Sequence, residues 1–408
     1  MPSCEEIRKD FPELETGIAY LDSAASSLKP RAVVEAMREF TYRTYANVHR
    51  GVYKLSLEAS RAYEDAHEVV AKFIGARSWE EVIFTTNTTY AMNMAAMALL
   101  LNGRITRGSN IVITEGDHHS NILPWITAAK LAGAEVRVIP VNEEGVPRWE
   151  MLEELIDERT AVVAAGHVSN VTGYRAPVER IARIAHSVDA LVVVDGAQSV
   201  PHMPVNVYDL GIDMLAFSGH KMMGPTGIGV LWGRKDLLEE LDPPFTGGGT
   251  VKLVEPPPEG PGLPRINWED LPWKFEAGTP PIIEAVGLSA AVEYLERIGM
   301  EWIERHEYEL TDYTMRLLGE LEEVRIVGPR DPSRRIGIVS FVYSDIPPDT
   351  VGAYLSSRGV AVRTGLHCAH MLHLRLGLRM GSVRASFYAY NCKDDVERLY
   401  EALVELKQ

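Results

Sequence analysis

Short apolar runs alternate with helical patterns along the first half of the chain, and this alternation restricts the possible folds strongly. The helical patterns begin with those at 31–45 and 57–74, and the helix expected at 91–101 follows the first apolar run. The apolar runs lie at 82–85, 111–114, 136–140, 161–165, 191–194, 214–217 and 230–232. Strands covered on both faces have continuous apolar sequences, and strands that alternate with helices pair in parallel. The pattern therefore predicts an α/β fold whose mainly parallel, seven-stranded sheet is covered by helices.

The alternation ends at segment 246–273, which contains GGG, PPP and further glycines and prolines. We expect a long ordered loop or an interface arm there rather than a regular element, with a flexible linker as the alternative. A helical region at 282–321 follows. The later strands and helices are expected at 324–328, 336–343, 350–358, 360–363, 383–390 and 394–406. This second pattern predicts a smaller α+β domain.

The domain boundaries follow from the change of pattern. We expect a large domain at 22–284, and a small domain that combines 1–21 with 285–408 and carries a cysteine-containing loop at 365–382. The chain of 408 residues is long enough for two such domains.

Composition excludes several classes of function. The formal net charge of −16 argues against a surface that binds nucleic acid. Apolar runs stay well short of the roughly 20 residues that a membrane span needs. The first 15 residues lack the apolar core of a signal peptide. We therefore expect a cytoplasmic protein with neither a membrane nor a nucleic-acid partner.

The cysteines are Cys4, Cys368 and Cys392. Three are too few for a disulfide framework, and their scarcity fits a reducing compartment. Cys4 is expected in a mobile polar leader, and Cys392 at the beginning of the last helix.

An acid and a lysine follow two of the predicted strands. Asp195 comes directly after the run at 191–194, and Lys221 lies in SGHK after the run at 214–217. Open α/β sheets bind ligands at the carboxyl edge, where both residues fall. A buried carboxylate near a desolvated lysine suits pyridoxal 5'-phosphate, whose ring nitrogen needs an acid and whose aldehyde needs an amine. The alternative is a turn-forming aspartate and a solvated surface lysine.

Hydroxyls near a helix terminus could hold the phosphate of such a cofactor. Thr88 and Thr89 lie between a predicted strand and a predicted helix, although a plain helix cap explains the same residues. Ser218 and His220 flank Lys221 and could reach the same phosphate. The glycine run at 224–229 precedes a strand and lacks the dinucleotide spacing, so a Rossmann-type site is rejected.

Further polar residues follow the strands at the same edge. His118 could stack on a flat cofactor ring. Asn170 and Gln198 offer amides that could bind a ring oxygen or a substrate carboxylate.

Cys368 lies in the polar loop 365–382, between two predicted strands. Its neighbours in the loop are His367, His370, His373 and Arg375. Cationic or proton-accepting neighbours favour the thiolate, which is the nucleophilic form. A soft-metal cluster and a buried structural cysteine are the alternatives. We expect no metal, because adjacent ligands rarely fit one tetrahedral site.

Eight motifs occur in an order that resembles the SUF-type (group II) cysteine desulfurases, in the class V branch of the fold-type I pyridoxal-phosphate enzymes. The motifs are TNTTYAMN, GDHHSNILPW, HVSNVTG, VDGAQSV, SGHKMMGPTGIG, FEAGTP, VRTGLHCA and VRASFYAYN. The resemblance extends from Tyr20 to the last helix.

This resemblance implies a homodimer that converts L-cysteine to L-alanine with pyridoxal 5'-phosphate. Lys221 would bind the cofactor aldehyde and later remove the Cα proton, while Asp195 would pair with the pyridine nitrogen. Cys368 would attack the substrate sulfur and carry it as a persulfide. An acceptor or scaffold protein would then take the sulfur for iron–sulfur cluster assembly or thiolation.

The resemblance also assigns the surrounding contacts. His118 would stack on the ring and take part in catalysis, with Gln198 and Asn170 near the ring hydroxyl. The phosphate contacts would be Thr88, Thr89, Ser218, His220 and, from the other subunit, Thr279. The substrate contacts would be His49, Arg50, Asn170, Arg363 and Arg384.

One motif departs from the family pattern. The family usually has His-His-Cys-Ala, whereas this chain has Leu366-His367-Cys368-Ala369, which leaves the activation of the cysteine and the identity of the acceptor open. A selenocysteine lyase, a cysteine lyase and a class V aminotransferase are alternatives on the same cofactor site. A non-catalytic sulfur-pathway scaffold is an alternative of another class, and the presence of both Asp195 and Lys221 argues against it.

Overall fold

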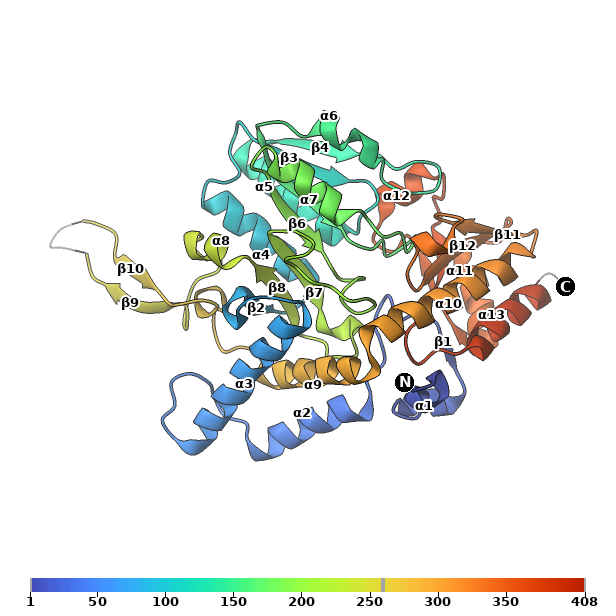
Figure 1. Cartoon of the computed structure of the whole chain (residues 1–408), viewed down its shortest axis with the longest axis horizontal. Helices are drawn as coiled ribbons and strands as arrows, with labels where there is room; N and C mark the ends of the chain where they lie inside the picture. Colours follow the sequence, from blue (N-terminus) through green and yellow to red (C-terminus); the bar gives the residue numbers. More distant parts are fainter. Residues whose placement is uncertain (1, 258–260, 407–408) are drawn as a thin grey trace.

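A seven-stranded sheet, in the order β2-β8-β7-β6-β5-β3-β4, forms the centre of the molecule (Figure 1). The computed structural model describes residues 2–257 and 261–406. The strands are β2 (Val82–Thr85), β3 (Asn110–Thr114), β4 (Glu135–Ile139), β5 (Thr160–Gly166), β6 (Leu191–Asp195), β7 (Met214–Ser218) and β8 (Gly229–Gly233). Strands β3 to β7 pair in parallel, and β8 is antiparallel to both of its neighbours. The predicted mainly parallel sheet is confirmed.

Helices cover both faces of this sheet because its strands are apolar on both sides. In β6, Val193 belongs to one core cluster while Val192 and Val194 belong to the other, as the alternation of strand side chains requires. Helices α4 and α5 pack in the first cluster, and α3, α7 and α9 pack in the second. The helices here are α2 (Arg31–Arg43), α3 (Lys54–Phe73), α4 (Thr88–Leu101), α5 (Leu123–Ala132), α6 (Leu152–Leu155), α7 (Val178–His186), α8 (Lys235–Glu240) and α9 (Ile282–Ile298).

A second, antiparallel sheet of order β11-β12-β15-β14 lies in the C-terminal part. Its strands are β11 (Val324–Val327), β12 (Ile338–Tyr343), β14 (Arg363–Gly365) and β15 (Ser382–Ser386), and the parallel pair β1 (Ala19–Tyr20) and β13 (Val360–Ala361) lies apart from it. The helices are α10 (Met300–Gly319), α11 (Pro348–Ser357), α12 (His370–Arg375) and α13 (Lys393–Leu406). The predicted α+β pattern is thus present, and the exact domain boundaries stay a prediction.

Three expected elements differ in the C-terminal part. The strand expected at 360–363 is two strands, β13 and β14, which pair in different sheets. The helical region expected at 282–321 is two helices, because Gly299, at a φ of +96°, separates α9 from α10. The strand expected at 383–390 ends at Ser386.

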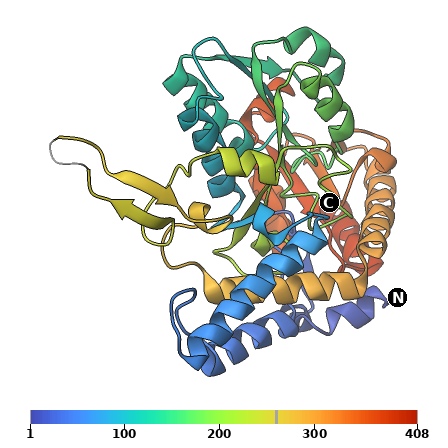
Figure 2. The same ribbon diagram turned by 60° about the vertical axis from the view of Figure 1, so that its left-hand side comes forward.

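The glycine- and proline-rich segment forms a hairpin. Strands β9 (Val251–Glu255) and β10 (Arg265–Trp268) pair antiparallel and project from the body of the molecule (Figures 1 and 2). The expectation of no regular element there is wrong, since the strands form between the glycine and proline clusters rather than within them. Leu253, Val254 and Ile266 are exposed on this ribbon. Whether the hairpin is an interface arm stays a prediction.

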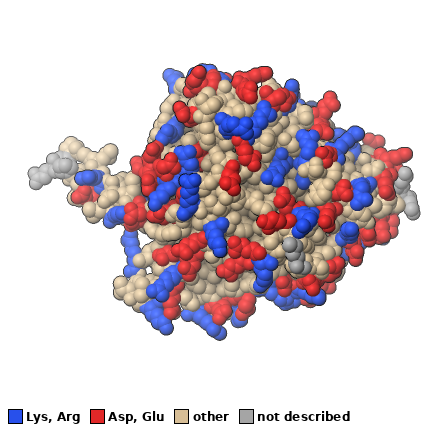
Figure 3. All heavy atoms as spheres, in the orientation of Figure 1, with Lys and Arg blue, Asp and Glu red and all other residues tan. Residues whose placement is uncertain are grey.

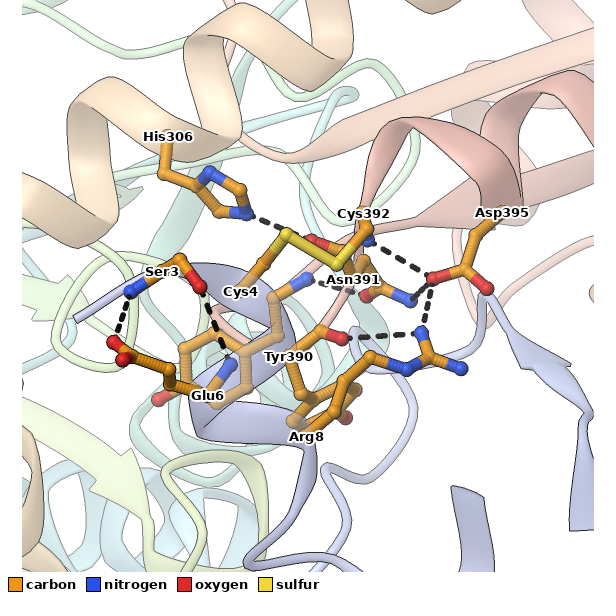
Figure 4. The surroundings of a disulfide bond; sticks show 10 residues. Ser3, Cys4, Glu6, Arg8, His306, Tyr390, Asn391, Cys392 and Asp395 are labelled. Carbon is orange, nitrogen blue, oxygen red and sulfur yellow. Dashed lines mark hydrogen bonds and ion pairs between the residues drawn. A yellow bond between two sulfur atoms is a disulfide. The ribbon is translucent and has the colours of Figure 1, made fainter. Parts of the chain in front are cut away.

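A disulfide joins Cys4 to Cys392 (Figure 4). The expectation of a mobile leader is therefore wrong, and the disulfide disagrees with the reducing compartment that the few cysteines suggested. Cys4 lies in α1 (Cys4–Arg8), which docks at the beginning of α13 through an Arg8–Asp395 ion pair of 2.6 Å. Ile7 within α1 and Phe11 shortly after it are buried. As predicted, Cys392 directly precedes the last helix, and its backbone N donates to Asp395 Oδ2 at 3.0 Å.

Breaking this disulfide is expected to lower the free energy of unfolding by about 2–4 kcal/mol, because a cross-link between distant positions restricts the unfolded chain. The two cysteines are 388 positions apart in the sequence. The Cys392→Ser variant should therefore melt at a lower temperature than the wild type, whereas Cys368→Ser should not. A reductant should lower the melting temperature of the wild type and leave that of Cys392→Ser unchanged. Equal melting temperatures for wild type and Cys392→Ser would contradict the expected contribution.

Charged side chains of both signs are interspersed over the face shown in Figure 3. The acidic excess is thus not gathered into one field on this face. Within residues 2–257 and 261–406, no helix is long and apolar enough to cross a membrane.

Candidate functional site

A cavity of about 450 Å³ lies at the carboxyl ends of β5, β6 and β7, where open α/β sheets bind ligands. All but three of the predicted site residues line this cavity. The predicted residues in its lining are Thr88, Thr89, His118, Asn170, Asp195, Gln198, Ser218, His220, Lys221, Arg363, Cys368 and Arg384. Arg363, Cys368 and Arg384 come from the C-terminal sheet and its cysteine loop, so the two sheets build the cavity together.

The other three predicted residues lie elsewhere in this chain. His49, Arg50 and Thr279 line a second cavity of about 530 Å³, together with Trp273 and Glu276. The His49 and Trp273 rings are 4.4 Å apart, measured between their centroids. Within a single copy of the chain, these residues therefore do not join the first cavity.

Asp195 and Lys221 face the first cavity from the ends of two adjacent strands. Asp195 Oδ1 accepts a hydrogen bond from the backbone N of Ala197 at 2.9 Å. Burial raises the pKa of the Asp195 carboxyl, although that hydrogen bond and the charge of Lys221 oppose the rise. Burial lowers the pKa of Lys221 to about 8, against the attraction of Asp195. About a tenth of the Lys221 amine is therefore neutral and nucleophilic at pH 7, far more than for an ordinary lysine.

Hydroxyl groups gather where α4 begins. Asn87 is the helix cap, since its side chain accepts from the backbone N of Tyr90 at 2.9 Å. The hydroxyls of Thr88 and Ser218 are 2.6 Å apart, and those of Thr89 and Ser120 are also 2.6 Å apart. The cap interpretation and the phosphate interpretation thus concern different residues. Asn87 caps the beginning of the helix, and the hydroxyls line the cavity beside its first turn.

The His118 ring is oriented by its own turn. The backbone N of Ser120 donates to His118 Nδ1 at 3.1 Å, which places the proton of the neutral ring on Nε2. Burial, aided by the charge of Lys221, lowers the pKa of His118 to about 3. The ring is therefore neutral at physiological pH.

Arg384 is a buried cation on β15. Its side chain donates to the Asn170 carbonyl at 2.9 Å and to Asp22 Oδ1 at 3.4 Å. Among the residues described, Arg384 Nε has no hydrogen-bond partner. Burial lowers the pKa of Arg384 to about 10, so it stays charged at neutral pH. Arg363 is half exposed beside it. A buried donor without a partner at a cavity wall is a candidate for holding an anionic ligand.

Two amides at the cavity wall contact the backbone. Asn170 Nδ2 donates to the carbonyl of His367 at 2.8 Å, so this amide is bound to the cysteine loop. Gln198 Nε2 donates to the carbonyl of Ala24 at 2.7 Å. Its Oε1 is buried and finds no partner in the described part of the chain.

Cys368 is an exposed, free cysteine at the cavity mouth, which contradicts the alternative of a buried structural residue. Most of its neighbours in the loop are engaged elsewhere, contrary to expectation. His367 Nε2 and His373 Nε2 each lie 3.1 Å from Ser382, and Arg375 binds Glu115. Burial lowers the pKa of His367 to about 2, so this ring is neutral.

The loop histidines also do not form a metal cluster. In the described ranges, the one group of three metal-type ligands with neighbouring donor atoms is Cys4, Glu5 and Cys392. Two of its members share the disulfide. The electrostatic surroundings of the Cys368 thiol instead include Lys221 and Arg384, whose charges interact with it.

Asp117 and Ser120 are polar cavity residues that the sequence analysis did not predict. Asp117 is buried, accepts from Asn121 Nδ2 at 2.8 Å, and has its pKa raised by burial to about 7. Ser120 bonds both the His118 ring and the Thr89 hydroxyl. Their position beside His118, in the motif GDHHSN, is the signal that would have indicated them.

Comparison with known proteins agrees with this geometry. Residues 19–399 match the family model described as "Aminotransferase class-V". A probable cysteine desulfurase from Aeropyrum pernix is 61% identical, over 99% of this chain and 98% of its own length. A cysteine desulfurase from Haloferax volcanii is 45% identical, over 98% of this chain and 96% of its own. The solved apo structure of a cysteine desulfurase from Thermococcus onnurineus is similar, with a TM-score of 0.93 and 42% identity over 100% of this chain and 98% of that one.

The matched residues span both sheets and the whole cavity, and the relatives are similar over nearly their full lengths. The chain therefore belongs to the class V aminotransferase family, among its cysteine desulfurases.

Proposed function

We propose that this protein uses pyridoxal 5'-phosphate to convert L-cysteine to L-alanine and leaves the sulfur on Cys368 as a persulfide. The observation that carries the proposal is one shared cavity. An amine from the seven-stranded sheet, Lys221, and a free thiol from the C-terminal part, Cys368, line it together. A sulfur transfer needs such an amine–thiol pair, whereas transamination needs the amine alone.

The residues present fit this cofactor. The buried Gln198 Oε1, which finds no partner within the described chain, could accept from a ring hydroxyl. Asp195 would pair with the ring nitrogen and the neutral His118 would stack on the ring. Thr88, Thr89, Ser218 and His220 would hold the phosphate near the first turn of α4. When bound, the cofactor would supply an electron-withdrawing ring that stabilises negative charge at the substrate Cα.

Side chains of the protein would bind the substrate, move its Cα proton and accept its sulfur. Arg384, whose Nε finds no partner among the described residues, would bind the substrate carboxylate, assisted by Arg363 and Asn170. Lys221 would accept the Cα proton, for which a pKa of about 8 is suitable. The Cys368 thiolate would attack the substrate sulfur. An S–S bond forms, the Cβ–S bond breaks, and Cβ gains a proton to give alanine.

The proposed active form is a homodimer. Thr279, His49 and Arg50 line a cavity of their own in one chain, so a second copy would have to carry them to the first cavity. There Thr279 would contact the phosphate, and His49 and Arg50 would contact the substrate. An acceptor protein would take the sulfur from the exposed Cys368, for iron–sulfur cluster assembly or thiolation. A cytoplasmic location is also proposed, although reducing compartments rarely keep a disulfide such as Cys4–Cys392.

The reaction is tested with L-cysteine and an excess of a reducing thiol. We expect alanine and sulfide in equal amounts, because the thiol releases the sulfur carried by Cys368. If no alanine or sulfide forms, and 3-mercaptopyruvate appears only when a 2-oxo acid is added as the amino acceptor, the proposal is contradicted and an aminotransferase is indicated. A kcat/KM for L-selenocysteine about a hundredfold above that for L-cysteine would indicate a selenocysteine lyase instead.

A further inference from the structure

The cysteine loop is tied to the seven-stranded sheet by contacts on both sides of Cys368. Asn170 Nδ2 donates to the carbonyl of His367 at 2.8 Å. The backbone N of His119 donates to the carbonyl of Cys368 at 2.8 Å. Seven residues further on, at the end of α12, Arg375 donates to the Glu115 carboxylate through Nε at 2.9 Å and through its second nitrogen at 2.5 Å.

These contacts hold an uncommon backbone conformation. His367 and Cys368 have φ values of +46° and +54°, in the left-handed region that residues other than glycine rarely adopt. Two such residues in succession persist only where their surroundings impose the conformation. The hydrogen bonds from Asn170 and His119 end on the carbonyls of these same two residues.

Glu115 is a fixed anchor for this loop. It follows β3 directly, its backbone N donates to the Ile139 carbonyl at 2.9 Å, and its Oε2 also accepts from the backbone N of Val141 at 3.1 Å. Burial acts to raise the pKa of Glu115, but the hydrogen bonds from Arg375 and Val141 outweigh it and lower the pKa. The carboxylate is therefore charged at neutral pH and can form a two-pronged pair with the guanidinium.

The apolar side of α12 packs on the same part of the molecule. Leu372 and Ala369 belong to a small buried cluster with Val171 from the loop after β5 and Val327 from β11. Arg375 is the last residue of the helix, and Leu376 and Leu378 just beyond it pack in the same cluster, so the pair with Glu115 fastens the polar side of this end to the large sheet.

We propose that the Glu115–Arg375 pair is a latch that positions the thiol of Cys368. The inference rests on the proposed role of Cys368 as the sulfur acceptor. The described lining of the cavity includes neither Glu115 nor Arg375, so both act through the loop as positioning residues. Without the latch, the end of α12 is released, residues 367–368 relax toward commoner φ values, and the thiol loses its place before the substrate sulfur. Substrate binding, which involves Arg384 on β15, is unaffected.

The test compares Arg375→Ala and Glu115→Gln with Arg334→Ala. Arg334 pairs with Glu144 at 3.4 Å, so the control variant also removes an ion pair between the C-terminal part and the large domain, without changing a residue of the cysteine loop. For both latch variants we expect kcat to fall about tenfold while KM stays within about twofold, because misplacing a reacting group affects the chemical step. The double variant should lose no more than the worse single variant, because the residues act as a pair. The kcat of Arg375→Lys should lie between those of the wild type and Arg375→Ala. Lysine keeps the positive charge but cannot form the two parallel hydrogen bonds of a guanidinium.

A second readout does not depend on turnover. The rate at which iodoacetamide alkylates Cys368 in the substrate-free enzyme should change at least about threefold in the latch variants. It should stay at the wild-type value in Arg334→Ala. Glu115→Gln is nearly isosteric, so it keeps the test valid if Arg375→Ala fails to fold.

The possible outcomes distinguish a failure of the Glu115–Arg375 proposal from a failure of the proposed sulfur transfer to Cys368. Unchanged kcat and alkylation rates in both latch variants, additive losses in the double variant, or equal losses in Arg334→Ala would overturn the latch. If the wild type forms no persulfide on Cys368, the proposed function fails, and the alkylation rates alone decide whether the pair positions the thiol. Wild-type persulfide together with latch variants that behave normally would overturn the latch alone.

Discussion

Replacement of Cys368 by serine is expected to slow alanine formation from L-cysteine by at least about a thousandfold, because a hydroxyl is a poor nucleophile at neutral pH and cannot carry sulfur as a persulfide. The side chain is exposed and unpaired, so the substitution should leave the fold and cofactor binding intact. Steady-state alanine production gives the rate. The visible absorbance of the purified variant and its melting temperature show whether the cofactor site and the fold are retained.

Cys4→Ser is the matched control, since it removes a cysteine far along the sequence from Cys368 and outside the cavity lining. It should keep the full rate below its melting temperature. If Cys368→Ser keeps more than about a tenth of the wild-type rate, the thiol is not the sulfur acceptor.

Replacement of Lys221 by alanine is expected to reduce the rate by at least about ten-thousandfold, because the same amine binds the cofactor and moves the Cα proton. Lys221 reaches the cavity beside Asp195, and burial lowers its pKa to about 8. The variant should also lose covalent attachment of the cofactor. Lys29→Ala is the control, because burial lowers the pKa of Lys29 to about 8 as well while the described cavity lining excludes it.

The lowered pKa gives the Lys221 prediction a pH signature. Only the neutral amine reacts with an aldehyde, so labelling of the cofactor-free protein by pyridoxal phosphate and borohydride should increase about tenfold from pH 7 to pH 9. A lysine with an ordinary pKa would show an increase of nearly a hundredfold over the same range. The labelled peptide should contain Lys221 and be absent from Lys221→Ala. A hundredfold increase at Lys221 would contradict the inferred burial of its charge.

The parts of the fold that the sequence predicted well are those determined by local pattern. The apolar runs located β2 to β8 within about two residues, because a strand buried on both faces has few alternatives. The proximity of Asp195 and Lys221 then follows from the pairing of β6 and β7, whose carboxyl ends meet at one edge.

The remaining features depend on contacts between distant segments. Cys4 and Cys392 become neighbours only when α1 docks at the beginning of α13, and no local pattern signals that docking. Likewise, the polar loop around Cys368 indicated a cluster of cations at the thiol. In the structure, His367 and His373 instead contact Ser382 at the end of the loop, and Arg375 pairs with Glu115, which follows β3. Motif reasoning found these chemical groups but could not assign their partners.

The central claim is that the sulfur leaves the substrate by bonding to Cys368. The most direct measurement mixes the enzyme with L-cysteine in the absence of any reducing thiol, stops the reaction after one turnover, and quantifies alanine and the Cys368 peptide together by mass spectrometry. The account predicts one added sulfur atom on that peptide for each alanine released. Alanine released while the Cys368 peptide stays unmodified would contradict it.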